Sequence, residues 1–183
     1  MAAAVTAPEW QHGAYRTQII ISHSVIVESK LRDEVSHPSC GAISSFIGVT
    51  RDNFKGRSVT HLEYTAYNSM AKKELQRICD EARRAADKSF LHAAQNGCKE
   101  EPALRHLAVA HRLGAVGIGA ASVAVYASSA HRDASIWAVG FIMDELKARV
   151  PIWKKEFFVG EVGGVWKANA ECGCGKRKQT EQG

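Results

Sequence analysis

The sequence predicts a mixed α+β fold built as one domain. Two long segments, 69–86 and 132–150, carry apolar residues at the 3.6-residue spacing of amphipathic helices. Several shorter segments are rich in β-branched residues, as strands are. The two kinds of segment do not alternate strictly, which favours α+β over a regular parallel α/β sheet. A chain of 183 residues is long enough for one domain with a substantial core.

Three strands are predicted in the N-terminal third of the chain. The β-branched residues of 17–28 predict a strand or a bent pair of strands, and the polar segment 33–39 predicts a connection. A second strand is predicted at 41–49 and a third at 59–67. The polar turn 51–56 lies between these two, so they are expected to pair as a hairpin.

The first helix, 69–86, is the clearest element of the pattern. Asn68 or Ser69 can cap it, and charged residues fill the face opposite the apolar stripe. The following segment, 87–104, loses this periodicity and contains a glycine and a proline, which predicts a loop insertion. The apolar stripe consists of Ala71, Leu75, Ile78, Cys79, Ala82 and Ala86.

The second helix, 132–150, is expected to be buried on two sides, because it carries two apolar stripes. It follows two predicted strands, 105–113 and 118–127. Pro151 ends it, because proline disfavours helical geometry in the preceding residue and cannot donate an N–H. One stripe consists of Ile136, Val139, Met143, Leu146 and Val150, and the other of Ala134, Trp137, Ala138, Phe141 and Ile142.

The ends of the domain are also predicted from composition. A last strand is expected at 156–162, with Trp166 as a final anchor. The domain is expected to cover 17–171, between a flexible leader, 1–16, and a disordered basic tail, 172–183. No apolar run approaches the roughly 18 residues of a membrane span.

Charge and cysteine content restrict the possible partners and the compartment. The formal net charge of +5 permits nucleic acid, an acidic protein or a phosphorylated small molecule as partner. The five cysteines are an odd number without a disulfide spacing, which favours a reduced, cytosolic location. Cys172 and Cys174 form a lone thiol pair without a second pair, so a zinc site is disfavoured, and we predict neither a metal nor a cofactor.

Two basic clusters stand at the two ends of the second helix. The segment Lys147–Glu156 concentrates four cations in ten residues, and His131 and Arg132 stand sixteen residues before Lys147. The N-terminus of a helix favours anions, and arginine suits phosphate. Lysine is the cation whose pKa neighbours can move toward an acid–base role. These clusters are therefore candidate parts of an anion-binding site.

Structural explanations remain open for the same residues. Lys147 can simply face the negative end of the helix dipole, and Arg132 can pair with Asp133. Arg51, which follows a predicted strand, can be an ordinary turn arginine. The pair His111-Arg112 at another strand end is interpreted as a structural histidine and a surface arginine.

Five motifs occur along the chain in this order: Phe46–Arg51, Leu62–Tyr67, His111–Gly114, Ser128–Arg132 and Lys147–Glu156. Together they closely resemble the large, catalytic subunit of molybdopterin synthase. The resemblance covers about residues 17–171, and two of its motifs, Ser-Ala-His-Arg and Pro-Ile-Trp-Lys-Lys-Glu, are nearly verbatim. The departures are the leader, the 87–104 loop and the Cys-Gly-Cys tail, which all lie outside the motifs.

The resemblance implies a sulfurtransferase of molybdenum cofactor biosynthesis. The family converts cyclic pyranopterin monophosphate (precursor Z) to molybdopterin by installing two dithiolene sulfurs. A small ubiquitin-like subunit carries the sulfur as a thiocarboxylate on its C-terminal Gly-Gly. The implied fold is an α/β hammerhead with an additional antiparallel sheet. The implied assembly is a dimer of large subunits with one small subunit at each end, a heterotetramer.

The resemblance also assigns the site, residue by residue. Lys147 matches the family's catalytic lysine and Lys154 the second lysine of the pocket. The substrate-binding residues would be Arg51, His131, Arg132, Lys147, Lys154, Lys155 and Glu156. Two other functions are alternatives. One is a nucleic-acid-binding module, which requires aromatic residues interleaved with basic ones, and the other is an inactive scaffold of the same fold. The apolar position of most aromatic residues disfavours the first, and the presence of both lysines disfavours the second.

Overall fold

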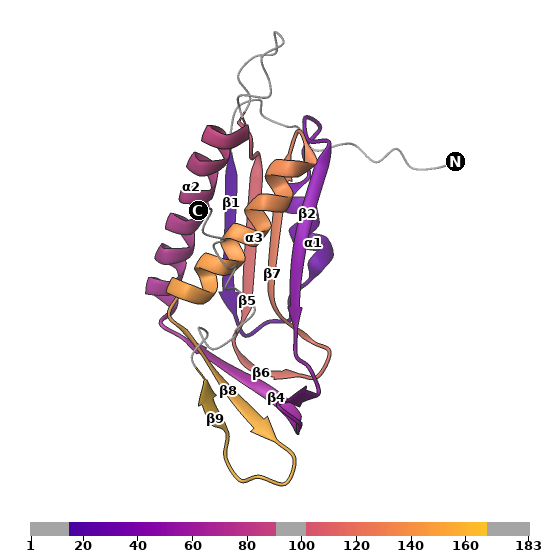
Figure 1. Ribbon diagram of the computed structural model, residues 1–183, viewed down its shortest axis with the longest axis vertical. Coiled ribbons are helices and arrows are strands. Elements are labelled where there is room, and N and C mark those ends of the chain that lie inside the picture. The colour runs from indigo at the N-terminus through magenta and orange to yellow at the C-terminus, as the bar shows by residue number, and fades with distance from the viewer. Residues whose placement is uncertain (1–14, 91–101, 168–183) are drawn as a thin grey trace, which may run out of the picture.

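A four-stranded sheet forms the centre of the molecule, as seen in a computed structural model that describes residues 15–90 and 102–167 (Figure 1). Its strand order is β1-β5-β7-β2. The edge strand β1 runs parallel to β5, and the other neighbours are antiparallel. The strands are β1 (Arg16–Ser22), β2 (Ala42–Val49), β5 (His106–Arg112) and β7 (Ala121–Ser129).

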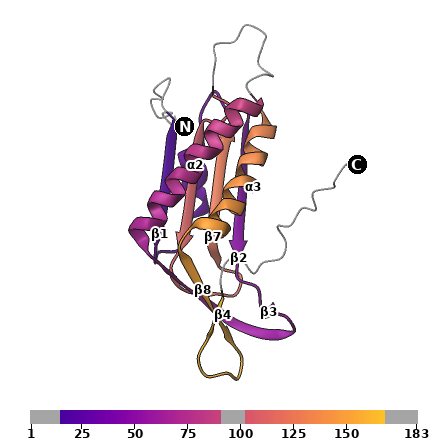
Figure 2. The same ribbon diagram turned by 60° about the vertical axis from the view of Figure 1, so that its left-hand side comes forward.

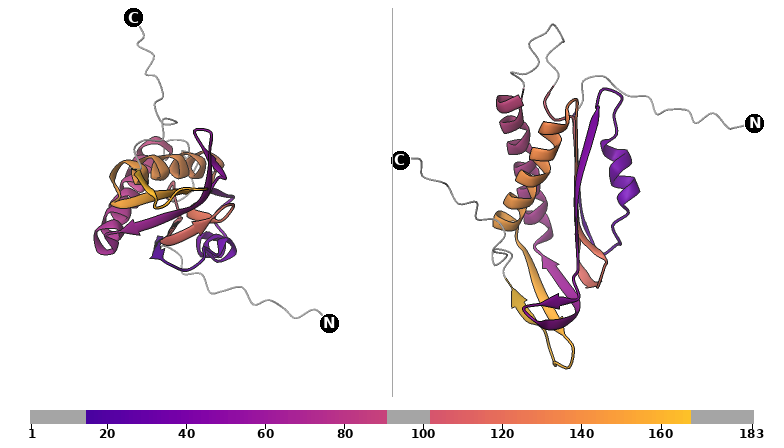
Figure 3. Two further views of the ribbon diagram at one scale, coloured as in Figure 1. Left: turned by 90° about the horizontal axis from the view of Figure 1, so that it is seen from below. Right: turned by 45° about the vertical axis from the view of Figure 1, so that its right-hand side comes forward.

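Helices cover both faces of this sheet, which gives three layers (Figure 3). Two long helices lie together on one face, and a short one lies on the other (Figures 1 and 3). The long helices are α2 (Asn68–Phe90) and α3 (Arg132–Arg149), and the short one is α1 (Glu28–Val35). No helix in the described ranges combines the length and the apolar character needed to cross a membrane.

Alternation along the central strands divides the core into two parts. Leu107 and Val109 of β5 belong to the larger core, under α2 and α3. Ala108 and Ala110 point the other way and pack with Leu31 and other residues of α1. Because successive side chains of a strand alternate between faces, one strand serves both layers.

A second sheet, of five strands, extends from one end of the first (Figure 2). Its path is β3-β4-β8-β9, β6 also pairs with β4, and every pairing is antiparallel. The predicted α+β class and the additional antiparallel sheet are thus confirmed. The strands are β3 (Asn53–Phe54), β4 (Arg57–Ala66), β6 (Gly114–Gly117), β8 (Ile152–Phe158) and β9 (Val165–Lys167).

Arg149 fixes the C-terminal end of α3 against α2. Its guanidinium donates to Glu74 at 2.8 Å and Glu81 at 2.6 Å, and also to Glu145 one turn earlier at 3.0 Å. The hydrogen bonds that it donates to these carboxylates raise the pKa of Arg149. Networks of this kind hold a helix more firmly than an isolated surface pair does. Arg149 therefore has a structural role, which distinguishes it from Lys147 two residues earlier.

The short helix α1 was not predicted from the sequence. The region 17–28 forms only β1, which ends at Ser22, and the predicted connection at 33–39 overlaps the end of α1. Two residues four apart, Leu31 and Val35, are its buried contacts, and a stripe of two is too short for a periodicity signal.

The predicted hairpin between 41–49 and 59–67 is wrong. Strand β2 pairs with β7 in the central sheet, whereas β4 pairs with β8 and β6 in the second sheet. The hairpin at this point is the smaller β3–β4 pair, which turns through Lys55 and Gly56 at positive φ values of 50° and 77°. Gly56 adopts this backbone without the steric cost that a Cβ brings.

Several boundaries and burials are also corrected. Helix α2 continues to Phe90, and β8 begins at Ile152, four residues before the predicted last strand. Strand β6 had not been predicted. Ile136 is 59% exposed and Trp166 is 57% exposed, so neither is the buried residue expected. The predictions for the leader up to residue 14, for 91–101 and for the tail lie outside the described residues.

Candidate active site

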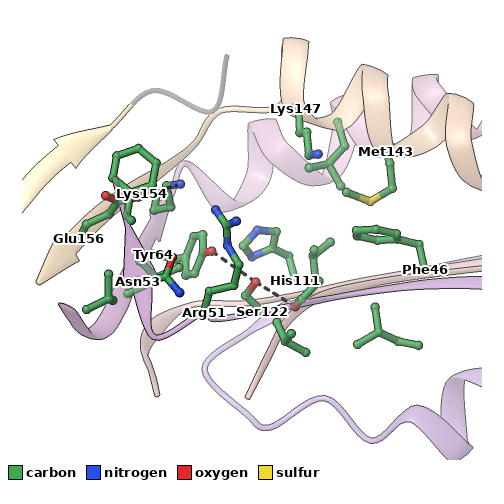
Figure 4. Close-up of a pocket in the computed structure, with 18 residues that line it drawn as sticks. Phe46, Arg51, Asn53, Tyr64, His111, Ser122, Met143, Lys147, Lys154 and Glu156 are labelled. Atoms are coloured by element: carbon green, nitrogen blue, oxygen red, sulfur yellow. Dashed lines mark hydrogen bonds and ion pairs between the residues drawn. The ribbon is translucent and has the colours of Figure 1, made fainter. Parts of the chain in front are cut away.

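A cavity of about 410 Å³ lies where the end of the central sheet, the last turn of α3 and the second sheet meet (Figure 4). The central sheet contributes residues of β2 and His111 of β5, α3 contributes Lys147, and β8 contributes Lys154 and Glu156. Arg51, which follows β2, completes the charged part of the lining. Four of the residues that the sequence assigned to a site therefore line one cavity.

Strand alternation brings Lys154 and Glu156 into the cavity together. These residues stand two apart on β8, so their side chains share a face. Lys154 Nζ lies 3.2 Å from Glu156 Oε1. Glu156 is 2% exposed, and its Oε2 has no hydrogen-bond partner among the described residues. A buried carboxylate with a free oxygen next to a lysine orients that lysine and retains an acceptor for a ligand.

Thr50 holds the backbone from which Arg51 extends. Its N–H donates to the carbonyl of Ala120 at 3.1 Å, and its carbonyl accepts from Gly119 N–H at 2.8 Å. Its hydroxyl donates to the carbonyl of Val116 at 3.3 Å. The chain leaves the central sheet at this fixed point, so the exposed Arg51 starts from a rigid base.

The wall beneath Arg51 is held by a chain of hydrogen bonds. Tyr64 Oη donates to Ser122 Oγ at 3.3 Å, and Ser122 Oγ donates to the carbonyl of Gly48 at 3.2 Å (Figure 4). Burial raises the pKa of Tyr64, so its hydroxyl stays protonated. A Cβ at Gly48 would stand 2.6 Å from a methyl group of Val123, so only glycine fits there without movement.

His111 is a cavity residue for which the sequence interpretation assumed a structural role. It is 4% exposed, and burial lowers its pKa to about 4. Its ring lies edge-on to Tyr64, with centroids 4.9 Å apart. The spacing along the strand could have indicated this position, because His111 shares a face with the core residues Leu107 and Val109 and lies at the cavity end of β5.

Lys155 lies on the other face of β8, away from the cavity. Its Nζ stands 5.2 Å from the ring centroid of Phe157 and 5.6 Å from that of Trp166. The alternation that places Lys154 inward necessarily places its neighbour outward. Within this chain, Lys155 is not among the groups that can meet a ligand bound beside Lys154.

His131 and Arg132 also lie away from the cavity. They stand at the N-terminal end of α3, whereas Lys147 is in its last turn, about 24 Å away at 1.5 Å per residue. Arg132 is 83% exposed at its side chain, with Nε 3.6 Å from Asp133. One small ligand cannot touch both ends of this helix in a single chain.

The cavity is suited to binding and neutralising anions. Three cations from three segments, Arg51, Lys147 and Lys154, line it over an apolar floor. Such preorganised donors stabilise negative charge more strongly than water does. Among the described residues no cysteine is in the lining, and burial raises the pKa of the core residue Cys79 to about 12. The described lining therefore supplies no thiol nucleophile of its own.

Comparison with known proteins identifies the family. The model of the MoaE protein family matches residues 21–149. The chain belongs to the MoaE family. It is 45% identical over 148 residues to molybdopterin synthase catalytic subunit 1 of Aedes aegypti, a match covering 80% of this chain and 86% of that one. It is also 45% identical to the human molybdopterin synthase catalytic subunit, over 76% of this chain and 67% of the relative.

Solved structures agree with this membership. The crystal structure of molybdopterin synthase from Staphylococcus aureus matches with a TM-score of 0.67 and 30% identity, over 82% of this chain and 95% of that one. A complex of subunits 1 and 2 of the molybdopterin-converting factor from Helicobacter pylori has the same fold, with a TM-score of 0.58 at 18% identity. The sequence-based expectation of a MoaE family enzyme in molybdopterin formation is confirmed.

Proposed function

We propose that this chain is the sulfur-transferring subunit of a molybdopterin synthase and that the cavity beside Lys147 is its active site. The observation that carries the proposal is the convergence of Arg51, Lys147 and Lys154 on one cavity, whose described lining residues include no thiol. A phosphorylated pterin needs cations, and an incoming thiocarboxylate supplies the missing sulfur. Precursor Z is the proposed substrate.

The two lysines would divide the chemistry. The thiocarboxylate sulfur attacks a carbon of the pterin side chain and forms a C–S bond while the C–O bond at that carbon breaks. The departing oxygen takes up a proton, and the carrier is left linked to the pterin as a thioester. Water then cleaves the acyl–sulfur bond, so the carrier departs as a carboxylate and the sulfur stays on the pterin. Lys147 would donate or accept the protons of these steps, and Lys154, oriented by Glu156, would stabilise oxyanions. Arg51 would bind the phosphate.

The proposed partner is a small ubiquitin-like subunit whose C-terminal Gly-Gly carries the thiocarboxylate. A tail without side chains is slim enough to enter a cavity of about 410 Å³ that a pterin shares. The proposed compartment is the cytosol, supported by the reduced state that the cysteine pattern favours.

A dimer would allow His131 and Arg132, which lie far from the cavity of their own chain, to reach the cavity of the partner chain. Strand β2 is an edge of the central sheet in the part of the chain that the structure describes. It exposes Ile43, Phe46 and Val49, and an apolar edge strand readily pairs with another strand. We propose that two chains pair along β2.

Symmetry then gives this pairing a specific consequence. Strand β2 and helix α3 are each about 25 Å long, and both run from the His131 end to the cavity end. Ser44 and Ser135, near their starts, are in contact at 2.9 Å. In an antiparallel two-fold pairing, the start of one β2 lies beside the end of the other. His131 and Arg132 of each chain are then carried toward the cavity of the other.

The test of the function is direct synthesis. The purified chain is mixed with a thiocarboxylated small subunit and precursor Z, and the product is examined by mass spectrometry. We expect a pterin that has gained two sulfurs, together with the small subunit carrying an ordinary carboxylate. Binding of both reactants without any sulfur transfer would instead indicate an inactive scaffold.

The shared site is tested by complementation between two inactive variants. Lys147→Ala and Arg132→Ala are each expected to be defective alone. In a mixed dimer, one cavity receives both changes and the other receives neither. Random mixing gives half mixed dimers, so about one quarter of wild-type activity should return.

Two controls accompany this mixture. Lys147→Ala mixed with Lys154→Ala should not recover, because both lysines come from the same chain in either cavity of the mixed dimer and each cavity keeps one change. If Lys147→Ala and Arg132→Ala also fail to recover after verified subunit exchange, the composite site is wrong.

A further inference from the structure

His111 occupies the active cavity without a part in the proposed transfer. The chemistry above uses cations and one carboxylate, whereas His111 is an uncharged ring at the junction of the cavity and the sheet. It also borders a second, smaller cavity on the other side, next to Lys30 of α1. In the view of Figure 4, its ring lies between Arg51 and Lys147.

Its neighbours determine which nitrogen carries hydrogen. His111 Nδ1 is 3.0 Å from the backbone carbonyl of Arg112. A carbonyl only accepts, so Nδ1 must be the protonated nitrogen of the neutral ring. Nε2 is then a bare acceptor, and no described residue donates a hydrogen bond to it. The pKa of about 4 keeps this form at neutral pH.

The ring is also fixed in orientation. Tyr64 packs edge-on against it at an interplanar angle of 72°, and Tyr64 itself is held by its bond to Ser122. The hydrogen bond from Nδ1 to the main chain also prevents the ring from flipping by 180°. The result is a preorganised acceptor, which loses little entropy when a ligand arrives.

An acceptor of this kind complements what the rest of the cavity offers. Arg51, Lys147 and Lys154 can only donate, and the hydroxyls of Tyr64 and Ser122 are occupied with each other and the main chain. Glu156 Oε2 is also a free acceptor, but it is a charged one and belongs to the carboxylate beside Lys154. A ligand that is a phosphate at one end and a ring with N–H groups at the other needs both kinds of partner. Cations alone would hold any phosphate of suitable size.

We propose that Nε2 of His111 accepts a hydrogen bond from a ring N–H of the pterin and thereby selects a phosphorylated nitrogen heterocycle over other phosphates. This inference rests on the proposed function and adds a specificity-determining residue to it. A site built to pair with a donor discriminates against ligands that lack it, because an acceptor that such a ligand covers is left unpaired.

The test compares two amide substitutions that differ in reach. The amide of His111→Gln extends to about the position of Nε2, whereas that of His111→Asn stops near Nδ1. Both are neutral and polar, and His111→Asn keeps a group near Nδ1 that can bond the main chain while it loses the group at Nε2. KM and kcat for precursor Z are measured for each variant, together with the inhibition constant of inorganic pyrophosphate as a probe of the cations alone.

We expect His111→Asn to raise KM for precursor Z about 10- to 100-fold, with kcat changed less than about threefold and pyrophosphate inhibition unchanged. His111→Gln should stay within about fivefold of wild type in KM. Equal behaviour of the two variants, or a fall in kcat alone, overturns the proposal. A parallel loss of pyrophosphate inhibition also overturns it, since that indicates general damage to the cavity.

Failure of this inference is distinguishable from failure of the function. If the wild-type chain makes no two-sulfur product, the proposed function is wrong. If it does and His111→Asn has a normal KM, only the role of His111 is wrong. His106→Asn, another buried histidine that lies on β5 but outside the cavity, controls for effects on stability.

Discussion

Lys147→Ala is expected to lower the rate of dithiolene formation about 10²- to 10⁴-fold while leaving the fold intact. The lysine is half-buried at the last turn of α3 and lines the cavity beside Lys154. Removing a positioned proton-transfer group typically costs this much in rate. Single-turnover formation of the sulfurated pterin, followed by mass spectrometry, measures the effect. Lys147→Arg keeps the charge without a transferable proton, so it should rescue binding of precursor Z but not turnover.

A neighbouring pair of lysines provides the matched control. Lys154→Ala removes a cation from the cavity, whereas Lys155→Ala removes one from the opposite face of the same strand. We expect the first to reduce turnover at least tenfold and the second to change it less than about threefold. Comparable losses from both would show that total charge, and not the cavity geometry, matters. Unchanged turnover in Lys147→Ala would refute the catalytic role assigned to it.

The second large effect is loss of stability in mild acid. Burial lowers the pKa of His111 and of His106 to about 4, from an ordinary 6.5. Between pH 4 and pH 6.5, the two histidines are protonated in the unfolded chain but neutral in the folded chain. The free energy of unfolding therefore falls as pH drops from about 6.5 to about 4. His111 alone accounts for about 2 kcal/mol of this loss by pH 5. The pH dependence from either histidine fades about one unit above pH 6.5, where the unfolded chain no longer binds these protons.

Urea unfolding at pH 7 and pH 5 measures this effect. His111→Gln and His106→Gln should each flatten the profile, because glutamine does not titrate in this range. Below about pH 4.5 the carboxylates begin to contribute, so the comparison stays above that value. An equally steep profile in both variants would mean that other groups control the acid response.

The long helices show how much local pattern determines. Helix α3 was expected to end at Val150, and the structure gives Val150 an extended backbone before Pro151. Helix α2 carries the predicted stripe as its buried residues. In contrast, the two-residue stripe of α1 was too short to notice, and Ile136 belongs by spacing to a stripe yet is exposed. Spacing defines a face but does not say how far a neighbour extends over it.

The candidate site was predictable in its residues but not in its arrangement. Arg51, Lys147, Lys154 and Glu156 were all named from sequence motifs, and they do line one cavity. Lys155 was named with them because it is adjacent in the motif, yet strand alternation turns it to the other face. His111 was interpreted as structural, because a histidine at a strand end carries no functional signal until its neighbours in space are known.

The sequence by itself determined the family, the two long helices and the identity of the cations, since these depend on local residue order. The tertiary structure decided which strands pair, which lysine faces the cavity, and that His131 and Arg132 lie about 24 Å from Lys147 within one chain. The physical reason is that strand pairing joins residues far apart in the chain through backbone hydrogen bonds that any sequence can make. Only the packing of a whole sheet against its helices selects among the possible pairings.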